Sequence, residues 1–505
     1  MQISISAGAV LGIDAQLVNV EVKISPGIKY FLVGLADNAV KEGYYRIEAA
    51  LESCGIKIPR KKIIVNLAPA DLKKVGSCYD LPIASGILLA SNKISSSIYK
   101  DYIIMGELAL NANVLPIKGA LSITILAKKL GYKGVVIPEA NLQECSLIDG
   151  LEIIGVRNLK EVISFLVLGE RPKKITDKII FSDENESLDM LDVKGQTYAK
   201  RALCIAAAGG HNIIMIGSPG SGKSMLSKRL SSILPSLSKE ESIECTQLFS
   251  IAGRLKSNQY INKRPFRAPH HTISNIALVG GGNVPRPGEV SLAHNGVLFL
   301  DEMLEFRPSS LEVLRQPMED CRVNISRAKY QTEFPAKFML VGAMNPCPCG
   351  YLGDPSHSCQ CTESIIQKYR SKLSGPLMDR IDIHLHIKAV SYKELTLNSK
   401  EEKCSKEWGE IVLKARNRQK NRFCDPILTN GGMSEKLILK HCTLDYNIEE
   451  WLKKTLTQLS FSARTYFKLL KLSRTIADVE ESINIKKEHL VEAIQLRGLD
   501  RVNNY

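Results

Sequence analysis

The sequence predicts an α/β protein of several domains, with one central domain built on a parallel sheet. Two observations carry this prediction. Residues 212–216 and 297–300 are short, almost wholly apolar runs, the pattern of parallel strands that are buried on both faces. Polar or glycine-rich residues follow each run. A chain of 505 residues is also long enough for roughly two to four domains.

The first run leads into GSPGSGKS, residues 217–224, and then into a helix-like segment that Pro235 ends. Strand, glycine-rich turn and helix are the context in which GxxxxGK[ST] binds phosphate, because glycines let the backbone N–H groups turn inward. Lys223 would reach the β- and γ-phosphates and Ser224 would bind Mg²⁺. An accidental glycine-rich turn is the alternative. The predicted ATP-binding residues are Gln196, Gly217, Ser218, Pro219, Gly220, Ser221, Gly222, Lys223, Ser224 and Met225.

The second run lies in NGVLFLDE, residues 295–302, and ends in two carboxylates. Open α/β sheets place their chemistry at the carboxyl ends of their strands. Asp301 would hold Mg²⁺ through water, and Glu302 would polarise the attacking water. A core strand followed by a solvated helix start is the alternative. With the glycine-rich loop, this motif predicts a nucleoside triphosphatase.

Composition narrows the setting of such an enzyme. Hydrophobic residues make up 44% and charged residues 24%, as in an ordinary globular chain. We expect a cytoplasmic protein without a membrane partner, since no apolar stretch approaches ~20 residues and MQISISAGAVLGIDAQL lacks the pattern of a signal peptide. The 13 cysteines would then be reduced, some of them metal-bound. A net charge of +14 favours a polyanionic partner.

The chain divides into three blocks and a linker. Residues 1–168 mix short strands and helices, which predicts an α+β domain. Residues 169–190 are polar and charged, as in a linker. The nucleotide-binding domain would span residues 191–395. Residues 396–505 read as a basic, mainly helical domain.

Two further residues of the nucleotide domain are candidates for catalysis. Asn345 ends an apolar strand, FMLVGAMNP, and would sense the γ-phosphate or orient water. Arg380 stands just before another strand, in SGPLMDRIDIHLHI, and is a candidate arginine finger acting on a neighbouring subunit's nucleotide. An ion pair with Asp379 or Asp382 is its alternative role.

Residues outside the core motifs would complete the nucleotide site. Val193 and Gln196 would flank the adenine, in DVKGQTYAKRAL. Arg464 and Arg474, in the helical block, would reach the γ-phosphate from a lid. A solvated helix face is the competing interpretation of the two arginines.

Two basic segments are candidate DNA contacts, and a third is a candidate coupling segment. CRVNISRAKYQTEFPAKF reads as a hairpin with Arg327 and Lys329 near its tip, where they would follow DNA phosphates or only keep an edge soluble. KARNRQKNRF, residues 414–423, contains five cations. They would line a path for DNA or form a solvated helix face. RPFRAPHH, residues 264–271, would be an insertion that couples the ATP state to a channel, or a structural loop. No segment reads base edges, so DNA binding would be sequence-independent.

Four cysteines within fifteen residues form CPCG-x₈-CQC: Cys347, Cys349, Cys359 and Cys361. Four thiolates suit a tetrahedral zinc ion, with His357 as a substitute ligand. The C-x-C spacing is less diagnostic than C-x₂-C, and free reduced thiols are the alternative. A bound ion would be structural and would brace the loop after Asn345.

Taken in order, these parts resemble an AAA+ ATPase, and longer segments resemble the ComM/YifB subfamily of the magnesium-chelatase-like AAA+ ATPases. The resemblance lies in KRALCIAAAGGHNIIMIGSPGSGKS, RPFRAPHHTIS, GGGNVPRPGEVSLAHNGVLFLDE, GAMNPCPCG and LSGPLMDRIDIH. It continues into VGLADNAVKEGYYRIEAAL in the first block and SARTYFKLLKLSRTIADVE in the last. It therefore covers nearly the whole chain.

The resemblance implies roles for individual residues and for the assembly. It assigns phosphate binding to residues 217–224, Mg²⁺ and water to Asp301 and Glu302, and the first sensor to Asn345. Arg380 matches the arginine finger and Arg464 the second sensor. It also implies a ring, usually a hexamer, and a DNA helicase that drives branch migration during homologous recombination, with single-stranded or branched DNA as partner.

The first block resembles the Lon-protease-like fold of ribosomal S5 domain 2 type, but without its Ser–Lys dyad. In DLPIASG, Ile83 stands at the nucleophile's place, and Ser85 comes two positions later on the buried face of a helix. PIKGAL is followed by Ser122 where the dyad has lysine. A hydroxyl without a positioned base is no nucleophile, so we expect a scaffold or a DNA-binding module.

Three classes of function remain open. The first is a ring-forming DNA motor. The second is a chelatase motor protein that inserts Mg²⁺ into a porphyrin, although we recognise no metal-binding adhesion domain in this sequence. The third is a protein-remodelling ATPase whose basic charge is incidental. Salt-sensitive DNA binding and DNA-stimulated hydrolysis separate the first class from the others.

Overall fold

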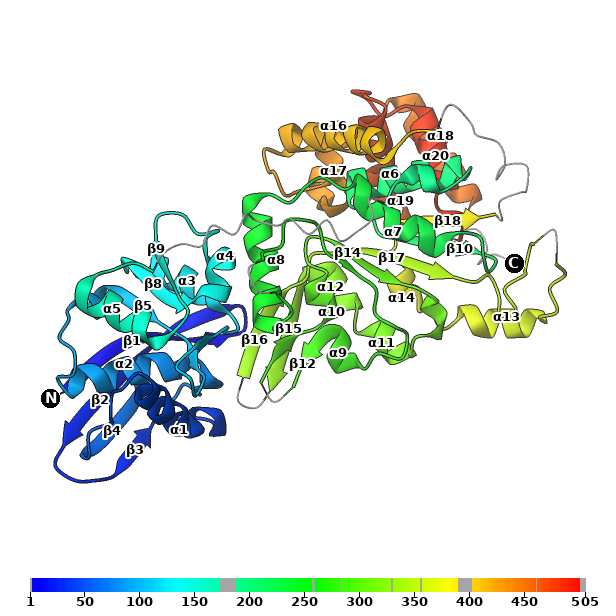
Figure 1. The fold of residues 1–505 in the computed structure, drawn as a ribbon. Helices are drawn as coiled ribbons and strands as arrows, with labels where there is room; N and C mark the ends of the chain where they lie inside the picture. The colour runs from blue at the N-terminus through cyan, green and yellow to red at the C-terminus, as the bar shows by residue number, and fades with distance from the viewer. Residues whose placement is uncertain are drawn as a thin grey trace.

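A computed structural model describes residues 2–172, 188–256, 259–282, 284–327, 330–354, 357–388, 402–459 and 461–499. It shows a multidomain α/β architecture, as the sequence predicts (Figure 1). One hydrophobic core fills the N-terminal domain, and two more cover opposite faces of a central parallel sheet. No described helix is both long enough and apolar enough to cross a membrane.

The N-terminal domain contains two larger sheets, their helices and a short antiparallel pair, β6 (Glu107–Leu108) and β7 (Val114–Leu115). The first sheet contains β1 (Gln2–Leu11), β2 (Asp14–Ser25), β4 (Lys62–Ala68) and β3 (Tyr30–Val33), in that order. The second is parallel and contains β5 (Tyr102–Ile104), β8 (Gly134–Pro138) and β9 (Glu152–Val156). The helices that pack with these sheets are α1 (Asn38–Ser53), α2 (Asp80–Ala90), α3 (Ala120–Lys129) and α5 (Leu159–Leu168).

Helix α2 is buried on every side, and this excludes its serine from catalysis. Ile83 is 1% exposed and Ser85 is fully buried, so neither can meet a substrate. The helix lies so close to β2 that a Cβ at Gly86 would stand 2.6 Å from Val22 Cγ2. Ser122, at the position of the dyad lysine, donates to the Ile13 carbonyl at 2.8 Å. The residues at and near the positions of the Lon dyad therefore lie in the buried core of this domain.

The central sheet has the order β11-β14-β17-β10-β18, and all its strands are parallel. Its members are β11 (Phe266–Arg267), β14 (Val297–Leu300), β17 (Met339–Met344), β10 (Ile213–Gly217) and β18 (Ile383–Ile387). Except for β11 and one position of β18, every residue of these strands is buried, which explains their continuous apolar sequences. Parallel pairing brings all their carboxyl ends to one edge.

Helices cover both faces of this sheet. The C-terminal helices join α6 on one face and share its core; they are α16 (Ser405–Phe423), α17 (Glu435–His441), α18 (Tyr446–Gln458), α19 (Ala463–Val479) and α20 (Lys487–Gln495). Helices of the nucleotide domain itself include α6 (Thr197–Gly209), α7 (Lys223–Ile233), α8 (Lys239–Ala252) and α12 (Arg315–Asp320). Side chains of β10 alternate between the two cores, Ile213 on one side and Ile214 on the other.

The predicted hairpin is present as β15 (Arg322–Arg327) and β16 (Tyr330–Pro335), paired antiparallel. Its inward residues, among them Val323 and Phe334, belong to the core on the second face of the sheet. Lys329 and the side chain of Arg327 lie outside the described residues, so their DNA-binding role stays a prediction.

The N-terminal domain contacts the nucleotide domain through the β1–β2 turn and along α8. Gly12, in the β1–β2 turn, faces β16: a Cβ there would lie 3.4 Å from Thr332 Cβ. Helix α3 packs beside α8, where the Gly119 amide donates to Ser250 Oγ at 3.0 Å. Figure 1 shows β16 and α8 next to the N-terminal domain. The middle of the hairpin, at Thr332, therefore lies against the β1–β2 turn of the N-terminal domain.

The basic segment 414–423 lies in α16, and three of its cations hold that helix in place. Arg416 donates to the Ala207 carbonyl at 2.7 Å, which joins α16 to α6. Arg418 donates to the Asp478 carbonyl at 3.0 Å, and Arg422 pairs with the Asp478 carboxylate. Each of the three arginines therefore has a structural partner within the chain and is not merely part of a solvated face, while a DNA path along this segment stays a prediction.

Arg474 belongs to the same buried network. It is 3% exposed, and its guanidinium lies 3.1 Å from Asp478 Oδ1 and donates to the Ser482 and Ile483 carbonyls at 2.7 Å each. With Asn430, which donates to the same carboxylate at 2.8 Å, it binds α16, α19 and the loop between them. Arg474 is a structural residue of the helical domain.

We predict that Asp478→Ala strongly destabilises the helical domain. Removing this carboxylate leaves the buried Arg474 and the half-buried Arg422 without their acidic partner, and breaking a buried pair costs about 3–5 kcal/mol. The midpoint of thermal unfolding, followed by circular dichroism, should fall clearly. Glu449→Ala, which breaks the exposed pair with Lys453 on α18, is the matched control and should leave the midpoint unchanged. Equal midpoints for both variants would contradict the assigned role of the network.

Candidate nucleotide site

The glycine-rich loop connects the end of β10 to the start of α7. Gly220 and Gly222 have φ values of 76° and 90°, in the region that favours glycine. A Cβ at either position would meet nothing within 4 Å, so the backbone conformation, not space, requires glycine there. Ser221 Oγ is buried and has no hydrogen-bond partner among the described residues. The loop is a turn that requires glycine and leaves the buried hydroxyl of Ser221 without a partner in the described part of the chain, which suits a phosphate ligand.

Lys223 lies at the centre of the site. Its ammonium donates to the Gly217 and Ser218 carbonyls at 2.7 and 2.9 Å and to Asn345 Oδ1 at 3.3 Å. Burial lowers the pKa of Lys223, while the nearby carboxylates of Asp301 and Glu302 act in the opposite direction. The loop carbonyls therefore hold the ammonium where the loop can present it to an anion.

The two predicted Mg²⁺ ligands are in direct contact. Ser224 Oγ donates to Asp301 Oδ2 at 2.7 Å, which brings α7 and the end of β14 together. A hydroxyl and a carboxylate are oxygen donors of the kind that Mg²⁺ prefers, with water and phosphate oxygens completing its shell. The donor set thus fits the predicted ion.

Glu302 adopts an unusual backbone conformation beside this pair. Its φ is 49°, in the left-handed region, and its amide donates to Asp301 Oδ1 at 3.0 Å. The side chain is 60% exposed, and its carboxylate lies 3.7 Å from His271 Nδ1. A non-glycine residue in this region is strained, and such strain concentrates at functional sites. The turn directs the carboxylate out of the sheet edge, where water can reach it.

The sequence did not predict that His271 lies beside the carboxylate of Glu302. It treated residues 264–271 as one insertion, but Phe266 and Arg267 form the edge strand β11. Arg264 pairs with Glu241 at 2.9 Å and Arg267 with Glu289 at 2.6 Å, so both arginines are structural. Only the last residue of the segment reaches the carboxylate of Glu302. Nothing in the sequence separates this histidine from the neighbouring His270.

The predicted adenine residues lie at the same edge of the sheet. Gln196 donates to the Lys388 carbonyl at 2.6 Å, directly after β18 ends. The preceding residue, Ile387, touches the phosphate loop, because its carbonyl oxygen stands 2.5 Å from where a Cβ of Gly217 would be. Val193 is 4% exposed and part of the adjoining core, while Met225 is exposed at the start of α7.

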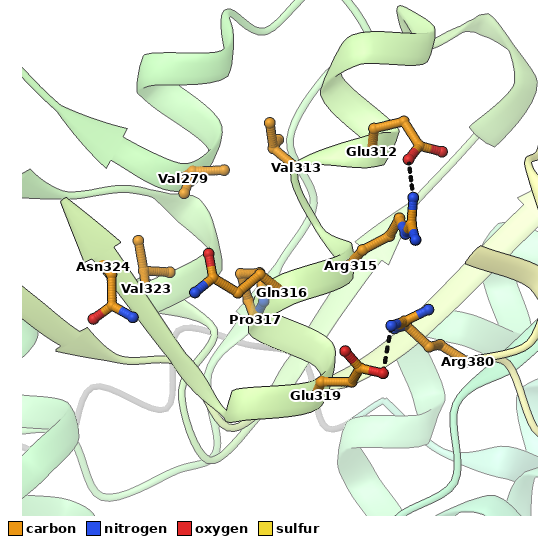
Figure 2. Close-up of a pocket in the computed structure, with 10 residues that line it drawn as sticks. All are labelled: Val279, Glu312, Val313, Arg315, Gln316, Pro317, Glu319, Val323, Asn324 and Arg380. Atoms are coloured by element: carbon orange, nitrogen blue, oxygen red, sulfur yellow. Dashed lines mark hydrogen bonds and ion pairs between the residues drawn. The ribbon is translucent and has the colours of Figure 1, made fainter. Parts of the chain in front are cut away.

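Arg380 and Arg464 lie at the opposite edge. Arg380 precedes the start of β18, pairs with Glu319 and donates to the Pro376 carbonyl at 2.6 Å, so neither predicted aspartate is its partner. Arg464 lies beside it, 3.0 Å from the Asp379 carboxylate, and not beside Lys223. Figure 2 shows Arg380 and Arg315 lining one pocket, each held by a glutamate.

The four cysteines converge as predicted. Their sulfur atoms all lie within 4.8 Å of one another. His357 does not belong to this group: its ring stacks on Tyr351 with centroids 4.7 Å apart, and its Nδ1 lies 3.9 Å from Asp354. The prediction of His357 as a substitute ligand is wrong in this arrangement, because the sequence could not show which way its side chain points.

This fold and site define an AAA+ protein of the magnesium-chelatase type. Residues 189–395 match the family described as magnesium chelatase, subunit ChlI, residues 20–141 match subunit ChlI of Mg-chelatase, and residues 402–497 match its C-terminal family. The chain is 40% identical over 498 residues to YifB of Escherichia coli, covering 98% of this chain and 96% of that protein. It is 40% identical over 502 residues to the competence protein ComM of Haemophilus influenzae, covering 98% and 97%. The chain belongs to the ComM/YifB subfamily of magnesium-chelatase-like AAA+ ATPases.

A more distant likeness concerns the first block. The archaeal Lon protease of Methanocaldococcus jannaschii is 30% identical over 140 residues, which are 28% of this chain and 21% of that protein. The predicted Lon-like fold of the N-terminal domain is thereby confirmed. Since Ser85 is buried, the likeness extends to the fold and not to the serine of the dyad.

We predict that Lys223→Ala weakens ATP binding by roughly 10- to 100-fold, since hydrogen bonds to charged groups contribute about 1.5–3 kcal/mol. Titration with a fluorescent ATP analogue measures the change. Lys228→Ala, which removes an exposed cation from the same helix, is the control and should bind as the unmodified protein does. Equal affinities for both variants would remove Lys223 from the nucleotide site.

Proposed function

We propose that this chain is a ring-forming, ATP-dependent DNA translocase or helicase that promotes branch migration in homologous recombination. One observation carries the ring: Lys223 and Arg380 lie at opposite edges of the same parallel sheet. The five residues of β18 separate the edges by about 17 Å, at ~3.3 Å per residue. Arg380 therefore serves the nucleotide of another copy, and the site is complete only between subunits.

The remaining catalytic residues act within one chain. Lys223 and the amides of residues 217–224 bind the phosphates, and Ser224 and Asp301 hold Mg²⁺. Glu302 accepts a proton from the attacking water, which it orients toward the γ-phosphate. Asn345 contacts Lys223 and so senses the γ-phosphate from the neighbouring strand. Bound Mg²⁺ neutralises the charge that develops on the phosphates.

Arg380 and Arg464 act from the other side of the subunit interface. Their glutamate and aspartate partners, Glu319 and Asp379, hold them in the single chain. Glu319 is exposed, so the arginine can exchange this partner for the triphosphate of a neighbour at little cost. Arg464, on α19, would report on the neighbour's nucleotide to the helical domain. The predicted hexamer follows the family's pattern.

DNA is the partner best supported by charge and by relationship. The net charge of +14 favours a polyanion, and the sequence places Arg327 and Lys329 at the tip of the β15–β16 hairpin as candidates for phosphate contacts. The relative from Haemophilus influenzae is named a competence protein. ATP and Mg²⁺ are then the cofactors for movement along single-stranded or branched DNA, and the four cysteines bind structural zinc.

A chelatase-like or protein-remodelling ATPase is the second candidate. The descriptions of all three matching families, which name magnesium chelatase subunit ChlI, favour it. The ring and its nucleotide site would be the same, and only the client would differ. The response of hydrolysis to DNA therefore decides between the two candidates.

We expect Arg380→Ala to lower kcat for ATP hydrolysis on the order of 10³-fold, as for other arginine fingers, with nearly unchanged ATP affinity. Steady-state hydrolysis and analogue binding give the two values. Arg322→Ala, which removes an exposed arginine paired with Glu333 on the hairpin, is the control. A variant with full kcat would show that Arg380 has no part in catalysis, and the argument for a shared site would fall.

We expect single-stranded and forked DNA to raise the hydrolysis rate several-fold, and added salt to remove this stimulation, because salt competes for phosphate contacts. Glu302→Gln should bind ATP but not hydrolyse it, and it serves as the blank. Hydrolysis that no DNA alters would refute the DNA motor and favour a chelatase or protein client.

A further inference from the structure

The distances between the four cysteine thiols fit one metal ion. Cys347 Sγ lies 3.3 Å from Cys349 Sγ and 3.6 Å from Cys359 Sγ, and the latter two are 3.6 Å apart. In a tetrahedral site with Zn–S bonds of ~2.3 Å, the sulfur atoms are about 3.8 Å apart. A disulfide would bring two of them to ~2.05 Å. The arrangement is thus that of a tetrathiolate site rather than of bonded pairs.

The segment that carries these thiols has no regular secondary structure of its own. The described residues between β17, which ends at Met344, and α13 (Glu363–Arg370) form only turns and bends. Cys347 is fully buried, and the other three thiols belong to half-buried residues. Ordering such a segment costs about 1–2 kcal/mol per residue in backbone entropy, which few apolar side chains here offset. A cross-link through a metal ion supplies the missing constraint.

The same segment forms one wall of the phosphate loop. Gly350 has φ of 87°, and a Cβ there would stand 2.7 Å from Pro219 Cδ and 3.9 Å from Asn345 Cγ. Backbone therefore lies directly against Pro219, with no side chain between. On its outer side, Arg370 donates to the Pro346 carbonyl at 3.2 Å. Cys347 and Cys349 lie between these two contacts in sequence, and the sulfur atoms of Cys359 and Cys361 lie beside theirs.

We propose that Cys347, Cys349, Cys359 and Cys361 bind one Zn²⁺ ion, and that this ion holds residues 346–350 against Pro219 and keeps Asn345 in place. Each thiol gives up its proton to solvent as it binds, so the ion replaces up to four protons. When the ion is lost, by chelation or by oxidation of the thiols, residues 346–350 are no longer held against Pro219. The nucleotide site then binds ATP less tightly. The effect on hydrolysis rests on the proposed ATPase activity, whereas metal binding does not.

Metal content tests the site. The purified full-length protein should contain one zinc per chain by inductively coupled plasma mass spectrometry. Cys349→Ser/Cys361→Ser should contain little, and Cys424→Ser, which changes an exposed cysteine outside the cluster, should keep its zinc. Exchange of zinc for Co²⁺ should give the visible and near-ultraviolet bands of a tetrahedral thiolate site. Protein without zinc, or with equal zinc in both variants, would overturn the proposal.

The coupling to nucleotide is tested by two variants that separate metal from contact. Gly350→Ala keeps every thiol but places a methyl group against Pro219, so it should keep its zinc while the Kd of a fluorescent ATP analogue rises several-fold. Cys349→Ser/Cys361→Ser should lose both zinc and affinity. Circular dichroism shows whether each variant is folded, and reversible removal of zinc from the unmodified protein repeats the test without substitution.

The outcomes distinguish the two proposals. Zinc-free protein that binds the analogue as tightly as the zinc form would refute the coupling. Protein that contains zinc and binds nucleotide through this wall, but hydrolyses no ATP, would refute the proposed function and leave the metal site standing.

Discussion

In the central sheet, Ile216 of β10 lies opposite Met344 of β17, and Leu300 of β14 lies opposite Gly342 two residues before it. This parallel register brings the phosphate loop, the two carboxylates and Asn345 to one edge, although Ser224 is 77 residues from Asp301 and Lys223 is 122 residues from Asn345. The strands can hold it because both of their faces are buried. Lys223 and Ser224 then need only one turn of helix to meet Asn345 and Asp301.

The same register also keeps Arg380 away from the nucleotide site of its own chain. A residue that precedes a parallel strand is at the far edge, and Arg380 precedes β18. No rotamer of arginine spans a sheet of this width, so in the proposed ring Arg380 would act on the nucleotide of another copy. The proposal therefore links hydrolysis to assembly. In the single chain, the exposed carboxylates of Glu319 and Asp379 hold Arg380 and Arg464.

The sequence predicted what local patterns determine. Apolar runs predicted the buried strands, the loop GSPGSGKS predicted the turn, and alternation predicted the hairpin. It failed where the partner is distant: Arg264 binds a glutamate 23 residues away, and Arg416 binds a carbonyl 209 residues away. A cluster of cations therefore resembles a DNA-binding surface until the fold shows which carbonyls and carboxylates it meets. The orientations of His271 and His357 depend on tertiary contacts in the same way.

The contacts of α8 connect the N-terminal domain with the nucleotide site. Ser250, near one end of α8, accepts from Gly119 of the N-terminal domain, and Glu241, near the other end, binds Arg264 beside β11. Strand β11 pairs with β14, whose next residues are Asp301 and Glu302. His271 follows β11 and returns to Glu302. The N-terminal domain and the Glu302 carboxylate are therefore joined through one helix and one edge strand. A force on the N-terminal domain would therefore reach the edge of the sheet that carries Glu302 through this helix and this strand.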